Sequence, residues 1–409
     1  MNIHQQITEI IHGEDQRQAT GLELIPSENY ASMAVRRCMA SSLCNKYSEG
    51  YAGARYYGGQ EFADKIERLA MEKACHLFNC KYANVQPLSG AMANVGVYAG
   101  LLKPGDTVMG MSLNHGGHLT HGHKVSITGA VYNWIHYGVA DISTGDIDYD
   151  EIEKMAMEHK PKLIVLGFSA YTRTLDYARF AAIAERVGAV TMMDAAHIAG
   201  LIAGKALKNP FDHGIDIITT TTHKTLRGPR GAVVLVREDE KLAKKVNKGV
   251  FPGVQGGPHM HQIAAKAQAF FEADTVEFQE YSAQVLRNAK AMEEAFHELG
   301  VPMVYGGTEN HMLLIDTALA YGMSGGEAEK LLDRAGLTIN KNSLPDDMRG
   351  PMDPSGIRFG TPAMTTRGMG KGEAKMVAQW MHEALSRSAE AGEIKVKVAE
   401  MCGKFSVPK

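Results

Sequence analysis

The sequence predicts an α/β protein with a mostly parallel sheet covered by helices, followed by a smaller α+β domain. The 409 residues suggest about two domains, because one hydrophobic core rarely serves more than about 250–300 residues. Apolar, strand-like segments alternate with amphipathic, helix-like segments through the first two thirds of the chain. The strand-like segments are β-branched and lack polar alternation, which indicates a sheet buried on both faces.

The elements of the first two thirds follow in order. A short helix is expected over 3–11, a loop rich in glycine and tyrosine over 45–60, and a helix over 61–78. The apolar residues on one face of that last helix are Ile66, Leu69, Ala70 and Ala74. The expected strands lie within residues 81–90, 106–111, 162–170, 189–197, 215–224 and 231–237. The helices expected between them span residues 91–102, 150–159 and 176–187.

The last third of the chain has a different pattern. One long helix is expected over 263–299, joining the two domains. The elements expected after it are a strand at 311–317, a helix at 325–335, a loop at 344–363 and a final helix at 371–387. The predicted divisions are an arm that contacts a partner subunit (1–50), a large cofactor-binding domain (51–275) and a small domain (276–409).

Composition and charge exclude several classes of protein. The net charge of -3 gives no electrostatic case for nucleic acid or an anionic membrane as a partner. The sequence shows neither an apolar run of about 18 residues nor a signal-peptide pattern, so we expect a cytoplasmic protein. Without a Cys-x-x-Cys pair, its cysteines are expected to be free thiols in a reducing compartment. They are Cys38, Cys44, Cys75, Cys80 and Cys402.

Polar residues follow three of the expected strands. They are Ser169, then Asp194 with His197, then His223 with Lys224. Ligands of open α/β sheets bind at the carboxyl ends of the strands. A lysine and an aspartate there suit pyridoxal 5'-phosphate (PLP), because the lysine forms a Schiff base and the aspartate keeps the pyridine nitrogen protonated. The alternatives are a structural ion pair, or a threonine-rich edge strand followed by a solvated basic turn.

The segment around Lys224, TTTTHKTLRGPRG at 219–231, is similar to the cofactor-lysine segment of the serine hydroxymethyltransferase family. The resemblance extends over nearly the whole chain in the right order. The other matching segments are IPSENYAS at 25–32, NKYSEGYAGARYYGG at 45–59, ANVQPLSG at 83–90, GGHLTHG at 116–122, DAAHIAGL at 194–201, VFPGVQGGP at 250–258, GGTENH at 306–311, NKN at 340–342 and SGIRFGTPAMTTRG at 355–368. The resemblance implies a fold-type-I PLP enzyme with a mostly parallel seven-stranded sheet, acting as a homodimer, or a tetramer, with shared active sites.

The resemblance assigns cofactor roles position by position. Lys224 matches the covalently binding lysine, Asp194 the partner of the pyridine nitrogen, and His118 the imidazole that stacks on the ring. The other positions that match cofactor-binding residues are Ser89, Gly90, Ala91, Ser169, His197 and His223, with Gly256 and Gly257 reaching the phosphate of the partner subunit. Thr221 and His223 join Lys224 in the predicted catalytic set.

The resemblance also assigns the substrate site. Arg358, assisted by Ser27, matches the residue that binds the amino-acid carboxylate, which suits the bidentate fork of a guanidinium. Glu49 matches the acid–base glutamate, and Tyr47 and Tyr57 its neighbouring tyrosines. The alternatives are a surface ion pair for Arg358, a solvated loop carboxylate for Glu49 and interface packing for the tyrosines. The positions that match folate-binding residues are Leu113, Gly117, His118, Leu119, Asn342, Gly350, Pro351 and Met352.

The chain departs from the family at the phosphate loop. Residues 88–94 read LSGAMAN where the family usually reads HSGSQAN, so Leu88, Ala91 and Met92 replace polar residues. One lost neutral hydrogen bond is worth about 0.5–1.5 kcal/mol, which predicts weaker cofactor retention. Met352 stands where an aromatic residue is sometimes found, which makes folate affinity less certain than PLP binding.

Four histidines lie close together in the sequence, and a zinc site has to be weighed. Their spacing does not match a helical HExxH motif, and glycines interrupt any helical face, so no metal site is predicted. The four are His115, His118, His121 and His123.

The favoured function is the reversible transfer of the serine hydroxymethyl group to tetrahydrofolate, giving glycine and 5,10-methylenetetrahydrofolate. The alternatives are folate-independent aldol cleavage of threonine-type substrates and transfer from α-methylserine, both of which would use the same cofactor residues. A degenerate, non-catalytic scaffold is supported only by Leu88, Ala91 and Met92.

Overall fold

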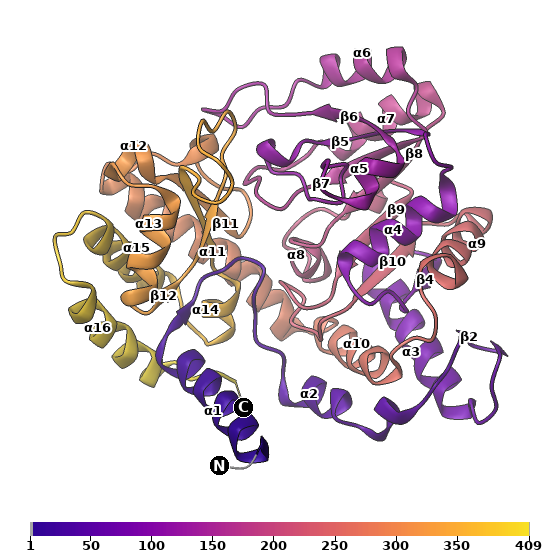
Figure 1. Cartoon of the computed structure of the whole chain (residues 1–409), viewed down its shortest axis with the longest axis horizontal. Coiled ribbons are helices and arrows are strands. Elements are labelled where there is room, and N and C mark those ends of the chain that lie inside the picture. The colour runs from indigo at the N-terminus through magenta and orange to yellow at the C-terminus, as the bar shows by residue number, and fades with distance from the viewer. Residues whose placement is uncertain (1–2, 409) are drawn as a thin grey trace. The chain divides into compact units, whose positions relative to one another are not determined.

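The computed structural model describes residues 3–408, which form two compact units (Figure 1). One unit comprises Ala31–Ala283. The other combines the residues up to Tyr30 with those from Gln284 onward. The arm predicted over residues 1–50 is therefore divided between the two units.

A seven-stranded sheet organises the unit Ala31–Ala283. Its strand order is β4-β10-β9-β8-β7-β5-β6, and β10 runs antiparallel to both of its neighbours while the other pairs are parallel. The strands are β4 (Tyr82–Asn84), β5 (Thr107–Met111), β6 (Asn133–Tyr137), β7 (Leu163–Gly167), β8 (Val190–Asp194), β9 (Ile217–Thr221) and β10 (Ala232–Val236). This topology confirms the predicted fold class.

Burial on both faces explains why the central strands are apolar throughout. Every residue of β7, β9 and β10 is buried. Side chains such as Val108, Val165 and Val234 pack in one cluster with Val97 of a covering helix. An alternating polar pattern would place polar groups against these helices, so the continuous apolar runs identify the strands.

Helices cover this sheet, and most of the predicted ones are present. Three of them begin at the capping residues Ser89, Asp148 and Asp176, whose side chains accept hydrogen bonds from first-turn N–H groups. The helices are α2 (Met33–Met39), α3 (Glu61–Phe78), α4 (Gly90–Leu101), α5 (Ile127–Val131), α6 (Tyr149–His159), α7 (Tyr177–Val187), α8 (Ala199–Ala203), α9 (Glu240–Lys248) and α10 (Met260–Ala273). The shorter elements are three 3-10 helices, a π-helical segment and a hairpin. The 3-10 helices are η1 (Ser42–Asn45), η2 (Leu113–His115) and η3 (Pro210–His213), the π-helical segment is η4 (Gly249–Val254), and β2 (Gly50–Tyr51) and β3 (Ala54–Arg55) form the hairpin.

The second unit is an α+β structure, as predicted for the last third of the chain. Its sheets have the orders β11-β14-β13, which is antiparallel, and β1-β12, which is parallel. The strands are β1 (Leu22–Glu23), β11 (Met312–Asp316), β12 (Leu337–Thr338), β13 (Asn340–Asn342) and β14 (Gly356–Gly360). The helical elements are α1 (Ile3–Thr20), η5 (Val304–Gly306), α12 (Thr317–Tyr321), α13 (Gly325–Arg334), α14 (Pro362–Thr366), α15 (Lys371–Leu385) and α16 (Ala391–Lys404), together with α11 (Val276–Glu298), which begins in the first unit.

The single long helix predicted over 263–299 is wrong. The chain forms α10 and α11, separated at Asp274 and Thr275. The Thr275 hydroxyl donates to the carbonyl of Glu272 and accepts from the N–H of Phe278, so it caps a new helix. A threonine cap does not interrupt the helical spacing of apolar residues. The spacing therefore predicts one continuous helix across Thr275.

Five further predictions need correction. The loop expected over 344–363 contains β14 and the start of α14. The first helix extends to Thr20, and α15 is followed by another helix, α16. Strand β6 had not been predicted, because this edge strand carries exposed polar residues. The buried face of α3 is formed by Ala63, Glu67, Ala70, Ala74 and Phe78, so Ile66 and Leu69 lie outside it.

No helix within residues 3–408 is both long enough and apolar enough to span a bilayer.

Candidate active site

The carboxyl ends of three adjacent parallel strands hold the predicted cofactor residues. Asp194 ends β8, and its register partners are Gly167 of β7 and Thr219 of β9. Ser169 follows β7, while Thr221 ends β9 and leads into His223 and Lys224. The structure therefore places these residues at one edge of the sheet, as the order of the strands predicted.

The Asp194 carboxylate accepts three hydrogen bonds from within the protein. Oδ2 accepts from Asn94 Nδ2 at 2.8 Å and from His121 Nε2 at 3.2 Å. Oδ1 accepts from the N–H of Ala196 at 3.1 Å. Asn94 is itself fixed, because its Oδ1 accepts from the Thr219 hydroxyl at 2.7 Å. The carboxylate is thus held rigidly at the end of β8.

The same network fixes the protonation of both neighbouring histidines. His121 Nδ1 accepts from the backbone N–H of His118, so its proton lies on Nε2, which faces Asp194. His118 Nδ1 lies 2.7 Å from the Thr120 hydroxyl and accepts from the Thr120 N–H. Burial lowers the pKa of His118 to about 4, so this imidazole is neutral at pH 7.

Asp194 remains ionised although it is buried. Burial alone would raise the pKa of its carboxyl, but the hydrogen bond and charge of His121, with further contributions from His118 and Asn94, hold that pKa well below its usual range. The Asp194 side chain is 9% exposed, so its charge acts in a medium of low dielectric constant. A fixed, buried negative charge of this kind can hold a proton on a nitrogen base placed against it.

The start of α4 and the loop after β9 form a second part of the site. Ser89 caps α4 and accepts from the N–H of Met92 at 3.3 Å. A Cβ on Gly90 would lie 2.8 Å from Thr221 Cγ2, so only glycine fits this close approach. Leu88 donates its N–H to Gln255 Oε1 at 3.0 Å, which ties the loop to the segment that contains Gly256 and Gly257.

His223 has an unsatisfied buried atom beside this loop. Its Nδ1 has no hydrogen-bond partner among residues 3–408. Burial, together with the charges of Arg230 and Lys224, lowers the pKa of His223 to about 3. An anion bound between the N-terminus of α4 and the side chains of Arg230 and Lys224 would compensate their positive charges.

A buried arginine organises the tyrosine-rich loop around Glu49. Arg55 donates through Nη1 to the carbonyls of Ser48 and Gly50, at 2.8 and 2.7 Å, which are the residues on either side of Glu49. Its Nε donates to Asp64 at 2.9 Å, and Nη2 donates to Glu67. The guanidinium therefore fixes the backbone that carries Glu49.

The predicted aromatic and glycine residues of this loop lie together. The rings of Tyr47 and Tyr57 are 5.0 Å apart in an edge-to-face arrangement, and both are more than half exposed. A Cβ on Gly257 would lie 3.1 Å from Tyr47 Cζ, and one on Gly256 would lie 3.4 Å from Glu49 Oε1. The structure brings these five predicted residues into one group.

The predicted residues Arg358 and Ser27 lie in the second unit. Arg358, on β14, donates through Nε to Asn340 Oδ1 at 3.1 Å. The N–H of Gly360 donates to the carbonyl of Leu24, which holds the segment before Ser27 against the same strand. Burial lowers the pKa of Arg358 to about 10, so its guanidinium stays charged at pH 7.

The predicted folate residues are distributed over both units. In the first unit, Leu113 begins η2, Leu119 is 45% exposed, and a Cβ on Gly117 would lie 2.1 Å from the carbonyl oxygen of Met111. In the second unit, Asn342 ends β13. Gly350, Pro351 and Met352 lie in an exposed loop, which Lys341 Nζ holds through the Met352 carbonyl at 2.7 Å.

Comparison with known proteins agrees with this geometry. Residues 1–381 match the family described as serine hydroxymethyltransferase. Serine hydroxymethyltransferase 1 of Pseudomonas aeruginosa is 53% identical over 397 residues, covering 96% of this chain and 94% of the relative. The chain belongs to the serine hydroxymethyltransferase family. Serine hydroxymethyltransferase 1 of Pseudomonas putida is 51% identical, covering 97% and 95%, and the serine hydroxymethyltransferase of Francisella philomiragia is 51% identical, covering 100% and 98%.

Family membership confirms the predicted fold-type-I class and the predicted transferase class. PLP is the cofactor of the family, and the site fits its chemistry. The ionised Asp194 would suit a pyridinium nitrogen, and Lys224 follows β9 at the same edge of the sheet. His223 and the start of α4 would offer donors to a phosphate.

The group His118, His121 and Asp194 also has the proximity of a metal site, since one ligand atom from each lies within 4.8 Å of the others. Hydrogen bonds account for the arrangement, because His121 donates its Nε2 proton to Asp194 and His118 Nδ1 accepts from Thr120.

Several residues of the site had no role assigned from the sequence. Asn94, His121 and Thr120 support Asp194 and His118, and Arg55 supports Glu49. Asn94 and His121 reach Asp194 across 100 and 73 positions, which no local spacing encodes, whereas Thr120 and Arg55 act on residues close to them in the sequence. All four lie inside segments that the resemblance singles out: Arg55 in NKYSEGYAGARYYGG, Thr120 and His121 in GGHLTHG, and Asn94 in the phosphate loop at 88–94.

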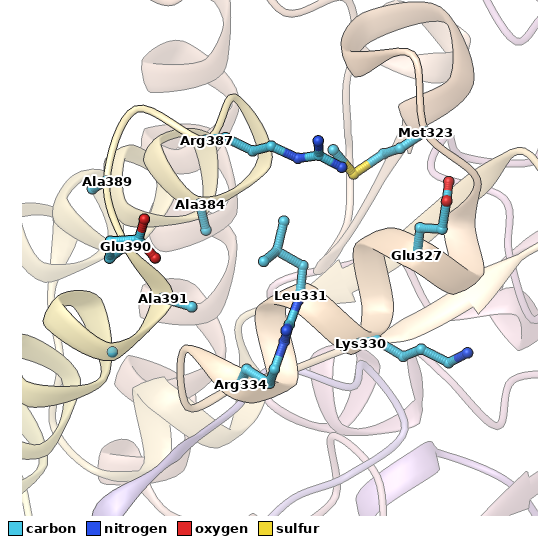
Figure 2. Close-up of a pocket in the computed structure, with 11 residues that line it drawn as sticks. Met323, Glu327, Lys330, Leu331, Arg334, Ala384, Arg387, Ala389, Glu390 and Ala391 are labelled. Carbon is cyan, nitrogen blue, oxygen red and sulfur yellow. The ribbon is translucent and has the colours of Figure 1, made fainter.

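A further cavity of about 710 Å³ lies in the second unit, between α13, the end of α15 and the start of α16 (Figure 2). Figure 2 shows Leu331 pointing into it and the Arg387 side chain extending toward Met323. None of the predicted site residues lines this cavity, so it is not the candidate active site.

Proposed function

We propose that this chain catalyses the reversible transfer of the serine hydroxymethyl group to tetrahydrofolate, giving glycine and 5,10-methylenetetrahydrofolate. The observation that carries the proposal is the ionised Asp194 carboxylate, held by three donors at the same sheet edge as Lys224. Family membership supplies the substrate class.

Four groups of residues would hold the cofactor. Lys224 would bind PLP covalently, and Asp194 would keep the pyridine nitrogen protonated. His223, Ser89 and the first N–H groups of α4 would bind the phosphate. PLP would supply an electron sink for the bond that breaks at the substrate α-carbon. His118, which is neutral, would face the ring without adding a positive charge beside it.

The substrate site orients serine and moves one proton. Arg358 binds the carboxylate through a charge-assisted, bidentate pair, and its hydrogen bond to Asn340 restricts the guanidinium plane. Ser27 assists from the segment beside β14. Glu49 takes or returns the proton of the serine hydroxyl, and Arg55 keeps the backbone on both sides of Glu49 in place.

The one-carbon acceptor requires a further surface. Tetrahydrofolate is placed against Leu113, Gly117, His118 and Leu119, and Asn342 and the loop at 350–352 complete its site. Met352 is 81% exposed, which leaves its side chain accessible to the cosubstrate.

We further propose that the protein acts as a homodimer in which each subunit supplies Tyr47, Tyr57, Glu49, Gly256 and Gly257 to the other's site. Figure 1 shows the hairpin after Glu49 at the rim of its unit. An apolar hollow of about 600 Å³ beside it is lined by Leu43, Phe62, Ile66 and Leu69, with Phe62 69% exposed. A second copy would cover this surface.

The free cysteines are consistent with a cytoplasmic location.

A comparison of three amino-acid substrates, supplied one at a time, tests the proposed reaction. Purified protein with PLP is given serine, α-methylserine or threonine, each with and without tetrahydrofolate, and the amino-acid product is quantified. The proposal predicts glycine from serine that depends on folate. Fastest turnover of threonine without folate would identify an aldolase, and preference for α-methylserine would identify the variant transferase.

A further inference from the structure

Two cysteines occupy paired positions at the end of α3. The helix ends in a Schellman motif, in which Asn79 is left-handed with φ 54° and ψ 57°. The N–H of Cys80 donates to the Cys75 carbonyl at 3.0 Å, and the N–H of Asn79 donates to the His76 carbonyl at 3.3 Å. In this motif the side chains at the positions of Cys75 and Cys80 meet, usually as an apolar contact.

The motif brings the two thiols to neighbouring positions at the end of α3. Cys80 Sγ lies 3.6 Å from the carbonyl oxygen of Tyr82, the first residue of β4. Both side chains are partly exposed, so small reagents can reach them. Because the backbone motif holds both positions side by side, rotation of the two side chains alone can bring the sulfurs together.

We propose that Cys75 and Cys80 form an oxidisable dithiol site that closes to an intramolecular disulfide. This goes beyond the proposed transferase function and does not depend on it. The oxidant is hydrogen peroxide. The Cys75 thiolate attacks one peroxide oxygen, the O–O bond breaks, and water leaves after protonation, giving a sulfenic acid. Cys80 sulfur then attacks Cys75 sulfur, the S–O bond breaks, and a second water leaves with the Cys80 proton.

The electrostatics distinguish the two sulfurs. The hydrogen bond from Cys80 lowers the pKa of Cys75, while the same contact and burial raise the pKa of Cys80 well above its usual range. Cys75 is therefore the attacking thiolate and Cys80 the resolving thiol. The exposed Cys44 serves as a comparison thiol for oxidation. Its Sγ lies 3.5 Å from Asn45 Oδ1.

Peptide mapping of the full-length protein tests the proposal directly. Trypsin cleaves after Lys73 and Lys81, so one peptide, ACHLFNCK at 74–81, contains both cysteines. The protein is treated with hydrogen peroxide, free thiols are blocked with an alkylating reagent, and the digest is examined by mass spectrometry. The expected result is a 74–81 peptide that is lighter by two hydrogens and carries no alkyl group, and that returns to the doubly alkylated form after treatment with dithiothreitol.

Single-cysteine variants separate the roles. In Cys80→Ser, Cys75 should stop at a sulfenic acid that dimedone traps, whereas in the unsubstituted protein dimedone labelling of Cys75 should be lost to ring closure. Cys44→Ser serves as the control and should leave closure unchanged. A doubly alkylated 74–81 peptide at peroxide levels that oxidise Cys44 would overturn the proposal. So would over-oxidation of Cys75 beyond the sulfenic acid without closure.

Discussion

Arg55 offers the sharpest test of how the tyrosine-rich loop is held. The Arg55→Met substitution keeps much of the side-chain volume and removes every donor. Arg55 is buried against two carboxylates, Asp64 and Glu67, whose side chains are 15% and 1% exposed. Burial already raises the pKa of Glu67 against the effect of Arg55, so loss of the guanidinium leaves a buried carboxylate uncompensated.

The magnitude follows from the contacts. Removing one partner of a buried ion pair costs about 3–5 kcal/mol, and the carbonyls of Ser48 and Gly50 lose their donor as well. Gly50 O keeps the Gln86 Nε2 donor at 2.9 Å, which limits the added loss. We therefore expect Arg55→Met to lower the free energy of unfolding by about 3–5 kcal/mol.

Urea unfolding at pH 7 measures the change, and a neighbouring arginine supplies the control. Arg68 also pairs with Asp64, at 3.4 Å, but its side chain is 58% exposed, so Arg68→Met should cost less than about 1 kcal/mol. Because Arg55 fixes the backbone around Glu49, the serine turnover number should fall in Arg55→Met and not in Arg68→Met. Equal stability of the two variants would refute the assignment of Arg55 as the organising residue.

Three further predictions concern the cofactor edge of the sheet. His118 has a folded pKa of about 4 against an ordinary 6.5, so below pH 6.5 the unfolded chain takes up a proton that the folded chain refuses. Stability should fall by up to about 3 kcal/mol as pH drops from 6.5 to 4, and His118→Asn should flatten that part of a urea-midpoint profile. Asp194→Asn should lower the turnover number by roughly a hundredfold while circular dichroism stays unchanged, because a neutral amide cannot hold a pyridinium proton; unchanged activity would remove Asp194 from the mechanism. Ala91→Ser should strengthen PLP retention about twofold to tenfold in equilibrium dialysis, as one added hydrogen bond implies, and no gain would mean that the departure at this position is compensated elsewhere.

The sheet was predictable because its signal is local. Runs such as the one at 163–167 are apolar throughout, and their carboxyl ends must meet at one edge when the strands are parallel. The same reasoning predicts that Asp194, His223 and Lys224 lie at one edge of the sheet. It did not find β6, because an edge strand with exposed polar residues lacks the continuous apolar run.

The parts that were not predictable depend on contacts between distant residues. Thr275 divides the long helix with its own hydroxyl, and a threonine inside an apolar repeat gives no warning of this. Asn94 reaches Asp194 across 100 positions, and His121 reaches it across 73. The residues that tune Asp194 therefore become visible only once the helix α4 and the loop after β5 are placed over the end of β8.

The most direct test of the central claim is to locate the cofactor on the chain. The protein is incubated with PLP, reduced with borohydride to fix any lysine adduct, digested and mapped by mass spectrometry, beside Lys224→Ala and the exposed-lysine control Lys208→Ala. The account predicts a single specific adduct at Lys224, unchanged in Lys208→Ala and absent in Lys224→Ala. A specific adduct on another lysine, or none on a folded protein, would contradict it.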